Sequence, residues 1–213
     1  MVKRIEDAQY AIYANSATGV KVLSNTFERN WVVARLVQKT ANPAATHVFR
    51  GNLFFGNVLK PPFSGQAPLP GTHSFAGIWA SSIPYVWLGD GSNSPNTALN
   101  RFVDLRIGII SNKSVFSVNR TSFETIIDAG IVEGYQTGIG ILAEASSYIV
   151  YAISPKDHYI RIYNNRFDNT NTGILTINAV YAERSATGDD KINDNYIYSS
   201  TISGASLIAP MTW

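Results

Sequence analysis

The chain has 213 residues, of which 45% are hydrophobic and 15% charged, and its formal net charge is +2. This length and apolar content suffice for one or two domains with a sizeable core, and the lack of cysteine excludes disulfides. The basic residues are scattered rather than gathered into a stripe, which argues against nucleic acid as a partner. Apolar runs fall far short of the ~20 residues of a membrane-spanning helix.

A short phrase recurs along the chain: an apolar residue, two positions, Asn or Thr, one position, and Phe or Ile. The polar and apolar members of its six copies are Asn25 and Phe27, Asn52 and Phe54, Asn100 and Phe102, Thr121 and Phe123, Asn165 and Phe167, and Asn195 and Ile197. Successive copies lie 27, 48, 21, 44 and 30 residues apart. With the steps of 48 and 44 interpreted as two repeats each, the unit has roughly 21 to 30 residues, which is typical of a solenoid.

The phrase predicts short strands with a polar and an aromatic residue on the same side. Its two members are two positions apart, so both side chains lie on one side of a strand. At an inward bend, the Asn amide can bond the backbone of the turn and the same Asn in the next repeat. The Phe is expected to stack on the Phe above and below. Helical periodicity is almost absent, so we predict an all-β chain of short parallel strands.

Several stretches carry a family resemblance, namely residues 5–12 (IEDAQYAI), 24–30 (SNTFERN) and 61–78. The repeated copies resemble the right-handed parallel β-helix repeats of pectate-lyase-like proteins. The three stretches resemble β-helix regions of large secreted surface proteins of Bacteroidetes, which the type IX secretion system exports. The resemblance implies a right-handed parallel β-helix solenoid of roughly 7–9 rungs. It also implies a single domain over residues 1–213 that is a segment of a larger protein.

The stretch 59–95 interrupts the repeat with six prolines and five glycines. It predicts a Pro/Gly-rich loop excursion from the coil, followed by a short strand at 85–88. Trp79, Tyr85 and Trp87 are grouped here. Aromatic rings with polar neighbours are suited to stacking on sugar faces. The other interpretation is that these rings pack the loop onto the coil, because a loop of this size needs a small core.

Residues 182–195 form a second interruption, which is rich in charge. Asp189, Asp190 and Asp194 are candidates for holding Ca²⁺ beside a basic residue for β-elimination, and Asp190 with Asp194 for a hydrolase carboxylate pair. The alternative is a solvated turn. The residue pattern of pectate lyases is not recognisable, so no catalytic residue is assigned, and Ca²⁺ is the one cofactor considered. A metal site is not indicated by the widely spaced histidines, which we expect at surface or strand-end positions: His47, His73 and His158.

Three functions fit these features. The first is a non-catalytic structural or adhesive module of an extracellular cell-surface or filament protein. The second is a polysaccharide-binding or polysaccharide-degrading β-helix that uses the aromatic or acidic candidates. The third, which is compatible with the first, is a homo-oligomer or end-to-end assembly through open strand edges. We therefore predict an extracellular structural module whose ligand is a polysaccharide or another cell-surface molecule.

Overall fold

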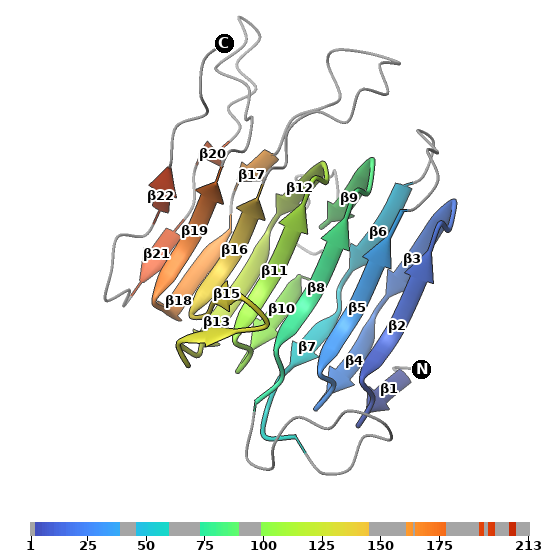
Figure 1. Ribbon diagram of the computed structural model, residues 1–213, viewed down its shortest axis with the longest axis horizontal. Coiled ribbons are helices and arrows are strands. Elements are labelled where there is room, and N and C mark those ends of the chain that lie inside the picture. The colour runs from blue at the N-terminus through green and yellow to red at the C-terminus, as the bar shows by residue number, and fades with distance from the viewer. Residues whose placement is uncertain are drawn as a thin grey trace, which may run out of the picture.

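The computed structural model is all-β over the part of the chain that it describes, which confirms the predicted fold class at that level. Three parallel sheets run side by side along the long axis, with the N-terminus at one end and the C-terminus near the other (Figure 1). The described residues are 3–38, 46–59, 73–89, 99–144, 161–163, 165–177, 192–193, 196–198 and 205–207.

The three sheets, named A, B and C, are each visited once as the chain winds through one coil. Sheet A contains, in spatial order, β1 (Lys3–Glu6), β4 (Asn25–Glu28), β7 (Leu53–Phe55), β10 (Asn100–Val103), β13 (Thr121–Ile126), β18 (Arg166–Thr170) and β21 (Tyr196–Tyr198). Sheet B contains β2 (Tyr10–Asn15), β5 (Val32–Val37), β8 (Ala76–Ser81), β11 (Ile107–Asn112), β16 (Ile139–Glu144), β19 (Thr172–Ile177) and β22 (Ala205–Leu207). This strand order is consistent with a parallel β-helix solenoid.

Sheet C completes each coil. It contains β3 (Gly19–Leu23), β6 (Thr46–Arg50), β9 (Tyr85–Leu88), β12 (Phe116–Asn119), β17 (Arg161–Tyr163) and β20 (Ile192–Asn193). The one antiparallel strand pair is a small hairpin of β14 (Ile131–Val132) and β15 (Tyr135–Gln136), which lies over the outer side of sheet B between β13 and β16 in the chain (Figure 1). Among the described residues, no helix is long and apolar enough to cross a bilayer.

The register corrects the predicted repeat length. Phe54 is paired directly with Phe102, and Phe123 directly with Phe167, so the steps of 48 and 44 residues each span one coil and not two. The extra residues lie between strands: β7 ends 20 positions before β8 begins at Ala76, and β16 ends 16 positions before β17 begins. A solenoid tolerates such insertions because each coil needs only its own strands in register with the neighbouring coils.

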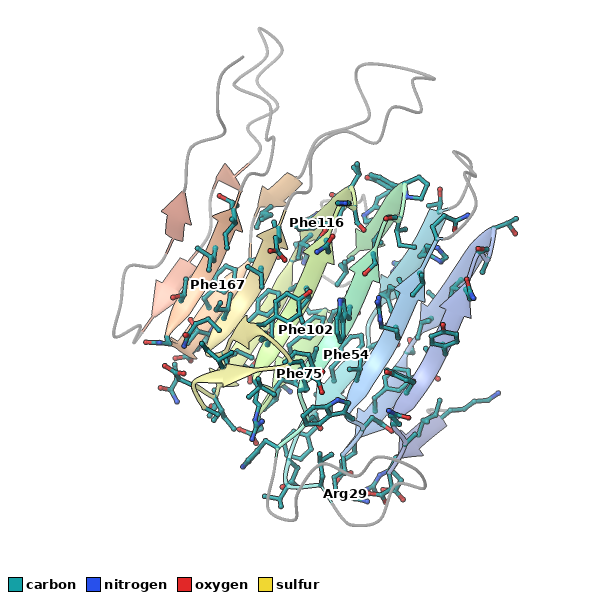
Figure 2. The ribbon with its side chains drawn as sticks, viewed as in Figure 1. Arg29, Phe54, Phe75, Phe102, Phe116 and Phe167 are labelled. Atoms are coloured by element: carbon teal, nitrogen blue, oxygen red, sulfur yellow. The ribbon has the colours of Figure 1, made fainter. Side chains whose placement is uncertain are left out.

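A column of phenylalanine rings fills the core behind sheet A. Ring centroids are 5.5 Å apart between Phe27 and Phe54, 4.3 Å between Phe54 and Phe102, 5.0 Å between Phe102 and Phe123, and 4.9 Å between Phe123 and Phe167. All five rings are fully buried and near-parallel (Figure 2). Each coil thus places one ring on the ring of the next coil, and this stacked contact adds to the burial of apolar area.

The asparagines of the repeat form a second column. The backbone N–H of Asn25 donates to Oδ1 of Asn52 (3.0 Å), and the N–H of Asn52 donates to Oδ1 of Asn100 (3.1 Å). Nδ2 of Asn52 donates to the Val22 carbonyl (2.8 Å), which closes the turn from sheet C into sheet A. Further along, the N–H of Thr121 donates to Oδ1 of Asn165 (3.0 Å). Each buried amide therefore bonds its own turn and the next coil.

The turn before each of these asparagines requires a left-handed backbone. Ser24, Gly51 and Arg120 stand one residue ahead of the ladder positions and have φ of 54°, 65° and 50°. This conformation reverses the chain sharply between sheet C and sheet A. Of the last copy of the phrase, Asn195 lies outside the described residues, whereas Ile197 lies in β21 opposite Phe167.

The strands of sheet B leave room for the phenylalanine column by placing glycine behind it. A Cβ atom at Gly108 would lie 2.5 Å from the carbonyl oxygen of Gly140 and 2.5 Å from a ring carbon of Phe123. Gly77 and Gly140 meet Phe102 and Phe167 in the same way. Glycine is required here by close approach, because both the backbone of the next coil and a stacked ring occupy the space.

We expect Gly108→Ala to lower the free energy of unfolding by about 1–3 kcal/mol, the usual cost of forcing an extra methyl into a packed core. Gly19→Ala is the matched control, because Gly19 is exposed and its nearest obstacle is a carbonyl oxygen 3.2 Å away. Urea denaturation of both variants measures the difference. Equal midpoints for the two variants would contradict the close packing of sheet B on the rings.

The stretch 59–95 contains two regular strands of the coil. β8 (Ala76–Ser81) and β9 (Tyr85–Leu88) occupy its second half, so the predicted short strand at 85–88 is present and a second strand was missed. Val58 and His73 form an antiparallel bridge that joins the two ends of the preceding segment. Residues 60–72 and 90–95 lie outside the described residues.

Candidate functional site

The three aromatic candidates lie on two different sheets. Trp79 belongs to β8 in sheet B, whereas Tyr85 and Trp87 belong to β9 in sheet C. The rings of Tyr85 and Trp87 are T-shaped with centroids 6.4 Å apart. The structure therefore brings Tyr85 and Trp87 together but does not unite them with Trp79 in one platform.

Trp79 is part of an apolar cluster on the outer side of sheet B, separate from the main core. Its ring centroid is 5.7 Å from that of Phe75 and 5.6 Å from that of Tyr135, both in edge-on contact. Tyr135 comes from the β14–β15 hairpin, which covers part of this side of the sheet (Figure 1). Burial raises the pKa of the Tyr135 phenol, with a smaller contribution from the Glu144 carboxylate.

The uncovered part of this surface is aromatic and cationic. Tyr13, Arg35 and Trp79 are in register on the adjacent strands β2, β5 and β8. Tyr13 is 56% exposed, and its ring lies 5.7 Å from that of Tyr10, which is 36% exposed. We call the surface formed by Tyr10, Tyr13, Arg35, Trp79 and Tyr135 the aromatic face. Of these residues, sequence reasoning identified only Trp79.

The missed residues carried a sequence signal. Tyr13 and Arg35 are separated by 22 residues, the same step that separates the paired positions Ile5 and Phe27. Aligning the sequence on that step places Tyr13 beside Arg35. Reaching Trp79 requires a step of 44 residues, which the two-repeat interpretation of long steps obscured.

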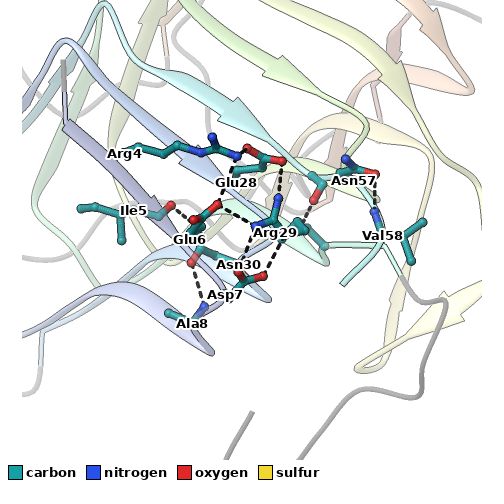
Figure 3. A network of polar contacts seen from close by, with 12 residues as sticks. Arg4, Ile5, Glu6, Asp7, Ala8, Glu28, Arg29, Asn30, Asn57 and Val58 are labelled. Carbon is teal, nitrogen blue, oxygen red and sulfur yellow. Dashed lines mark hydrogen bonds and ion pairs between the residues drawn. The ribbon is translucent and has the colours of Figure 1, made fainter. Parts of the chain in front are cut away.

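The acidic candidates Asp189, Asp190 and Asp194 lie outside the described residues, so the structure does not test the Ca²⁺ prediction. No group of three or more potential metal ligands occurs among the residues that are described. The acidic residues that do gather are Glu6, Asp7 and Glu28, around the side chain of Arg29 (Figure 3).

This acidic group is neutralised by a buried arginine. Nε of Arg29 is 2.8 Å from Oδ1 of Asp7, one terminal nitrogen is 2.6 Å from Oε2 of Glu6, and Glu28 is a third partner. The Arg29 side chain is only 8% exposed, and its hydrogen bond to Asp7 is the largest cause that raises its pKa. The cluster joins β1 to β4, so its role is to tie the first coils together.

A groove on the outer side of sheet A is also lined by charged residues. Arg101 forms a bidentate pair with Glu124 (2.7 and 3.1 Å), and Arg166 pairs with Asp168 (2.8 Å). The hydrogen bond from Arg101 is the main cause that lowers the pKa of Glu124. Charge in this groove is therefore largely satisfied within the chain, and exposed pairs of this kind contribute little to stability.

His47 is buried, so the expected surface position is wrong for this residue. It lies inside β6 between Val20 and Val86 on the neighbouring strands and is 1% exposed. Neither ring nitrogen has a hydrogen-bond partner among the described residues. Burial lowers the pKa of His47, because the charged imidazolium loses its hydration.

This burial predicts a loss of stability in mild acid. The unfolded chain takes up a proton at about pH 6.5, whereas the folded chain resists it, so stability falls as pH drops below about 6.5 and is unaffected by His47 above it. His47→Leu is expected to flatten this dependence. Urea midpoints of wild type and variant at neutral and mildly acidic pH measure it. Parallel pH profiles would contradict the prediction.

No protein-family model matches the chain, and neither a characterised protein nor a solved structure matches it significantly.

Proposed function

We propose that this chain is a segment of a right-handed parallel β-helix that serves as a non-catalytic structural and adhesive module of an extracellular surface protein. Right-handed winding is expected because about 98% of crossovers between parallel strands of one sheet have that hand. A coil of roughly 7–9 rungs, as the repeat suggests, would add length and contact area to a larger protein.

The observation that carries this proposal is the pair of continuous columns behind sheet A. Stacked rings run from Phe27 to Phe167, and buried asparagines bond one coil to the next. Both columns persist across the long insertions, so the interior forms one stiff stack while the outer surfaces are free to vary. Stiffness with variable outer surfaces is what a spacer or adhesin needs.

The contact surface that we assign to this module is the aromatic face of sheet B. Tyr10 and Tyr13 are large and exposed, and they lie beside a cation that is held in place by Trp79. Exposed aromatic residues and arginine are the residue types that are enriched where proteins bind partners. The proposed extracellular location and type IX export rest on the resemblance, and surface labelling of cells that produce the parent protein tests them.

Adhesion is tested with beads that carry the chain. Coated beads are expected to remain attached under flow to surfaces bearing cell-surface glycoprotein, and Tyr13→Ala on the aromatic face is expected to release them. The matched control is Leu23→Ala, which removes another exposed side chain, one on sheet C. Equal release by both variants, or no attachment on any surface, would refute the adhesive role.

A second candidate function is polysaccharide binding, which the register of Tyr13 beside Trp79 across β5 favours. Aromatic side chains on the outer side of one sheet suit a sugar chain that runs along the coil axis. Retention of the chain on immobilised polysaccharides tests this candidate. Release of reducing ends or unsaturated products during the same incubation would contradict the non-catalytic proposal. End-to-end assembly stays a prediction, which sedimentation at increasing concentration checks.

A further inference from the structure

Arg35 on the aromatic face is a half-buried cation whose guanidinium is fixed in position. Its Cζ lies 4.3 Å from the centroid of the Trp79 ring, within the range of a cation–π contact. One terminal nitrogen, Nη1, donates to the carbonyls of Leu36 (3.1 Å) and Trp79 (3.2 Å) and to the hydroxyl of Ser81 (3.0 Å). The side chain is thus held before any ligand arrives.

Arg35 has no carboxylate partner among the described residues, unlike the ion-paired arginines Arg29, Arg101 and Arg166. Burial is the largest influence on the pKa of Arg35 and lowers it, and the groups that oppose this effect are tyrosine hydroxyls. A cation that loses part of its hydration without a counter-ion costs free energy. An anion supplied from outside the described part of the chain would recover that cost.

The hydrogen bonds of the guanidinium leave one edge for such an anion. All three bonds to described residues use Nη1, so Nε and Nη2 have no partner among those residues. Two parallel N–H donors at one edge of an arginine match the two oxygens of a carboxylate. Tyr13 lies in register beside Arg35 on β2, where its exposed ring can contact the group that bears the carboxylate.

We propose that Arg35 binds the carboxylate of an acidic and apolar segment of a partner protein, which would lie across the aromatic face. This inference rests on the proposed adhesive function and names its ligand. A peptide fits better than a sugar because a sugar needs many polar partners. The outer side of sheet B continues from Arg35 into the apolar side chains of Ile110, Leu142 and Leu175.

The test is an NMR titration of the chain with two matched peptides, acetyl-Phe-Glu-amide and acetyl-Phe-Gln-amide. The indole N–H signal of Trp79, identified with Trp79→Phe, reports on binding. The glutamate peptide is expected to shift the signal saturably, and the glutamine peptide to bind at least about tenfold more weakly, because it lacks the charge. Arg35→Gln removes the difference, whereas the control Arg101→Gln, on sheet A, leaves it unchanged.

Three outcomes would overturn the proposal: equal binding of the two peptides, unchanged binding by Arg35→Gln, or a shift caused by glucuronate but not by either peptide. The last result would make this a saccharide site. Arg35→Lys, which keeps the charge but loses the paired donors, serves as the second variant if Arg35→Gln does not fold, and it is expected to bind more weakly than wild type. If coated beads adhere while neither peptide binds, the adhesive function stands and the assignment of Arg35 fails.

Discussion

Replacing Phe123 by aspartate is expected to unfold the protein at room temperature. The ring is fully buried between Phe102 and Phe167, with centroid distances of 5.0 and 4.9 Å. Removing a buried phenylalanine costs about 3–5 kcal/mol, and burying an unpaired carboxylate adds several more. The sum is comparable to the whole stability of a typical domain, which is about 5–15 kcal/mol. Circular dichroism during thermal melting measures the effect.

The matched control for this variant is Thr125→Asp. Thr125 lies in the same strand, β13, but is exposed and has a φ of 53°, a backbone conformation that aspartate tolerates well. The same charge is therefore added two residues away without burial, and the melting temperature is expected to stay near that of wild type. A Phe123→Asp protein that melts at the wild-type temperature would show that the ring column does not hold the coil together.

The repeat was predictable because its physical cause is local. A buried Asn at the turn and a Phe two positions later meet the same needs in every coil, namely a bonded turn and a filled core, so the residue types recur. The register between copies was not predictable in the same way. Phe54 and Phe102 are direct neighbours although 48 residues separate them, because insertions between strands change the spacing without disturbing the stack.

The candidate site was less accessible to sequence reasoning because it depends on the outer side of the coil. Outer residues are constrained only by their neighbours on adjacent strands, so they leave no repeated phrase. Trp79 was identified as an aromatic residue, but its partner Arg35 is 44 positions away and lies in an ordinary apolar strand. Tyr135 reaches the aromatic face through a hairpin that interrupts the coil, and no spacing rule predicts where such a hairpin folds back.

The same difference explains why His47 was misplaced. A histidine beside a predicted strand is usually polar surface, but His47 takes an inward position in sheet C, where Val20 and Val86 occupy the neighbouring coils. Only the cross-strand alignment shows that its column is apolar. Inner columns therefore set the residue type at most positions, and a residue that breaks its column is the place to expect a special property.

The asparagine column is expected to be nearly as sensitive as the phenylalanine column, and Asn52→Asp tests it with an isosteric change. Nδ2 of Asn52 donates to the Val22 carbonyl (2.8 Å) and to Oδ1 of Asn100 (3.2 Å) in a site that is 1% exposed. A carboxylate oxygen at that position faces two acceptors and has lost its hydration. We expect the free energy of unfolding to fall by at least about 3 kcal/mol at neutral pH.

The pH dependence of this variant separates a lost donor from a general loss of packing. Burial raises the pKa of the introduced carboxyl, so the folded variant binds a proton more tightly than the unfolded chain does. Stability relative to wild type should therefore recover as pH falls, because the protonated acid can again donate to the Val22 carbonyl. Asn25→Asp is the control: Asn25 is only half-buried, so about 1 kcal/mol is expected. A deficit in Asn52→Asp that is unchanged with pH would show that the amide acts by shape alone.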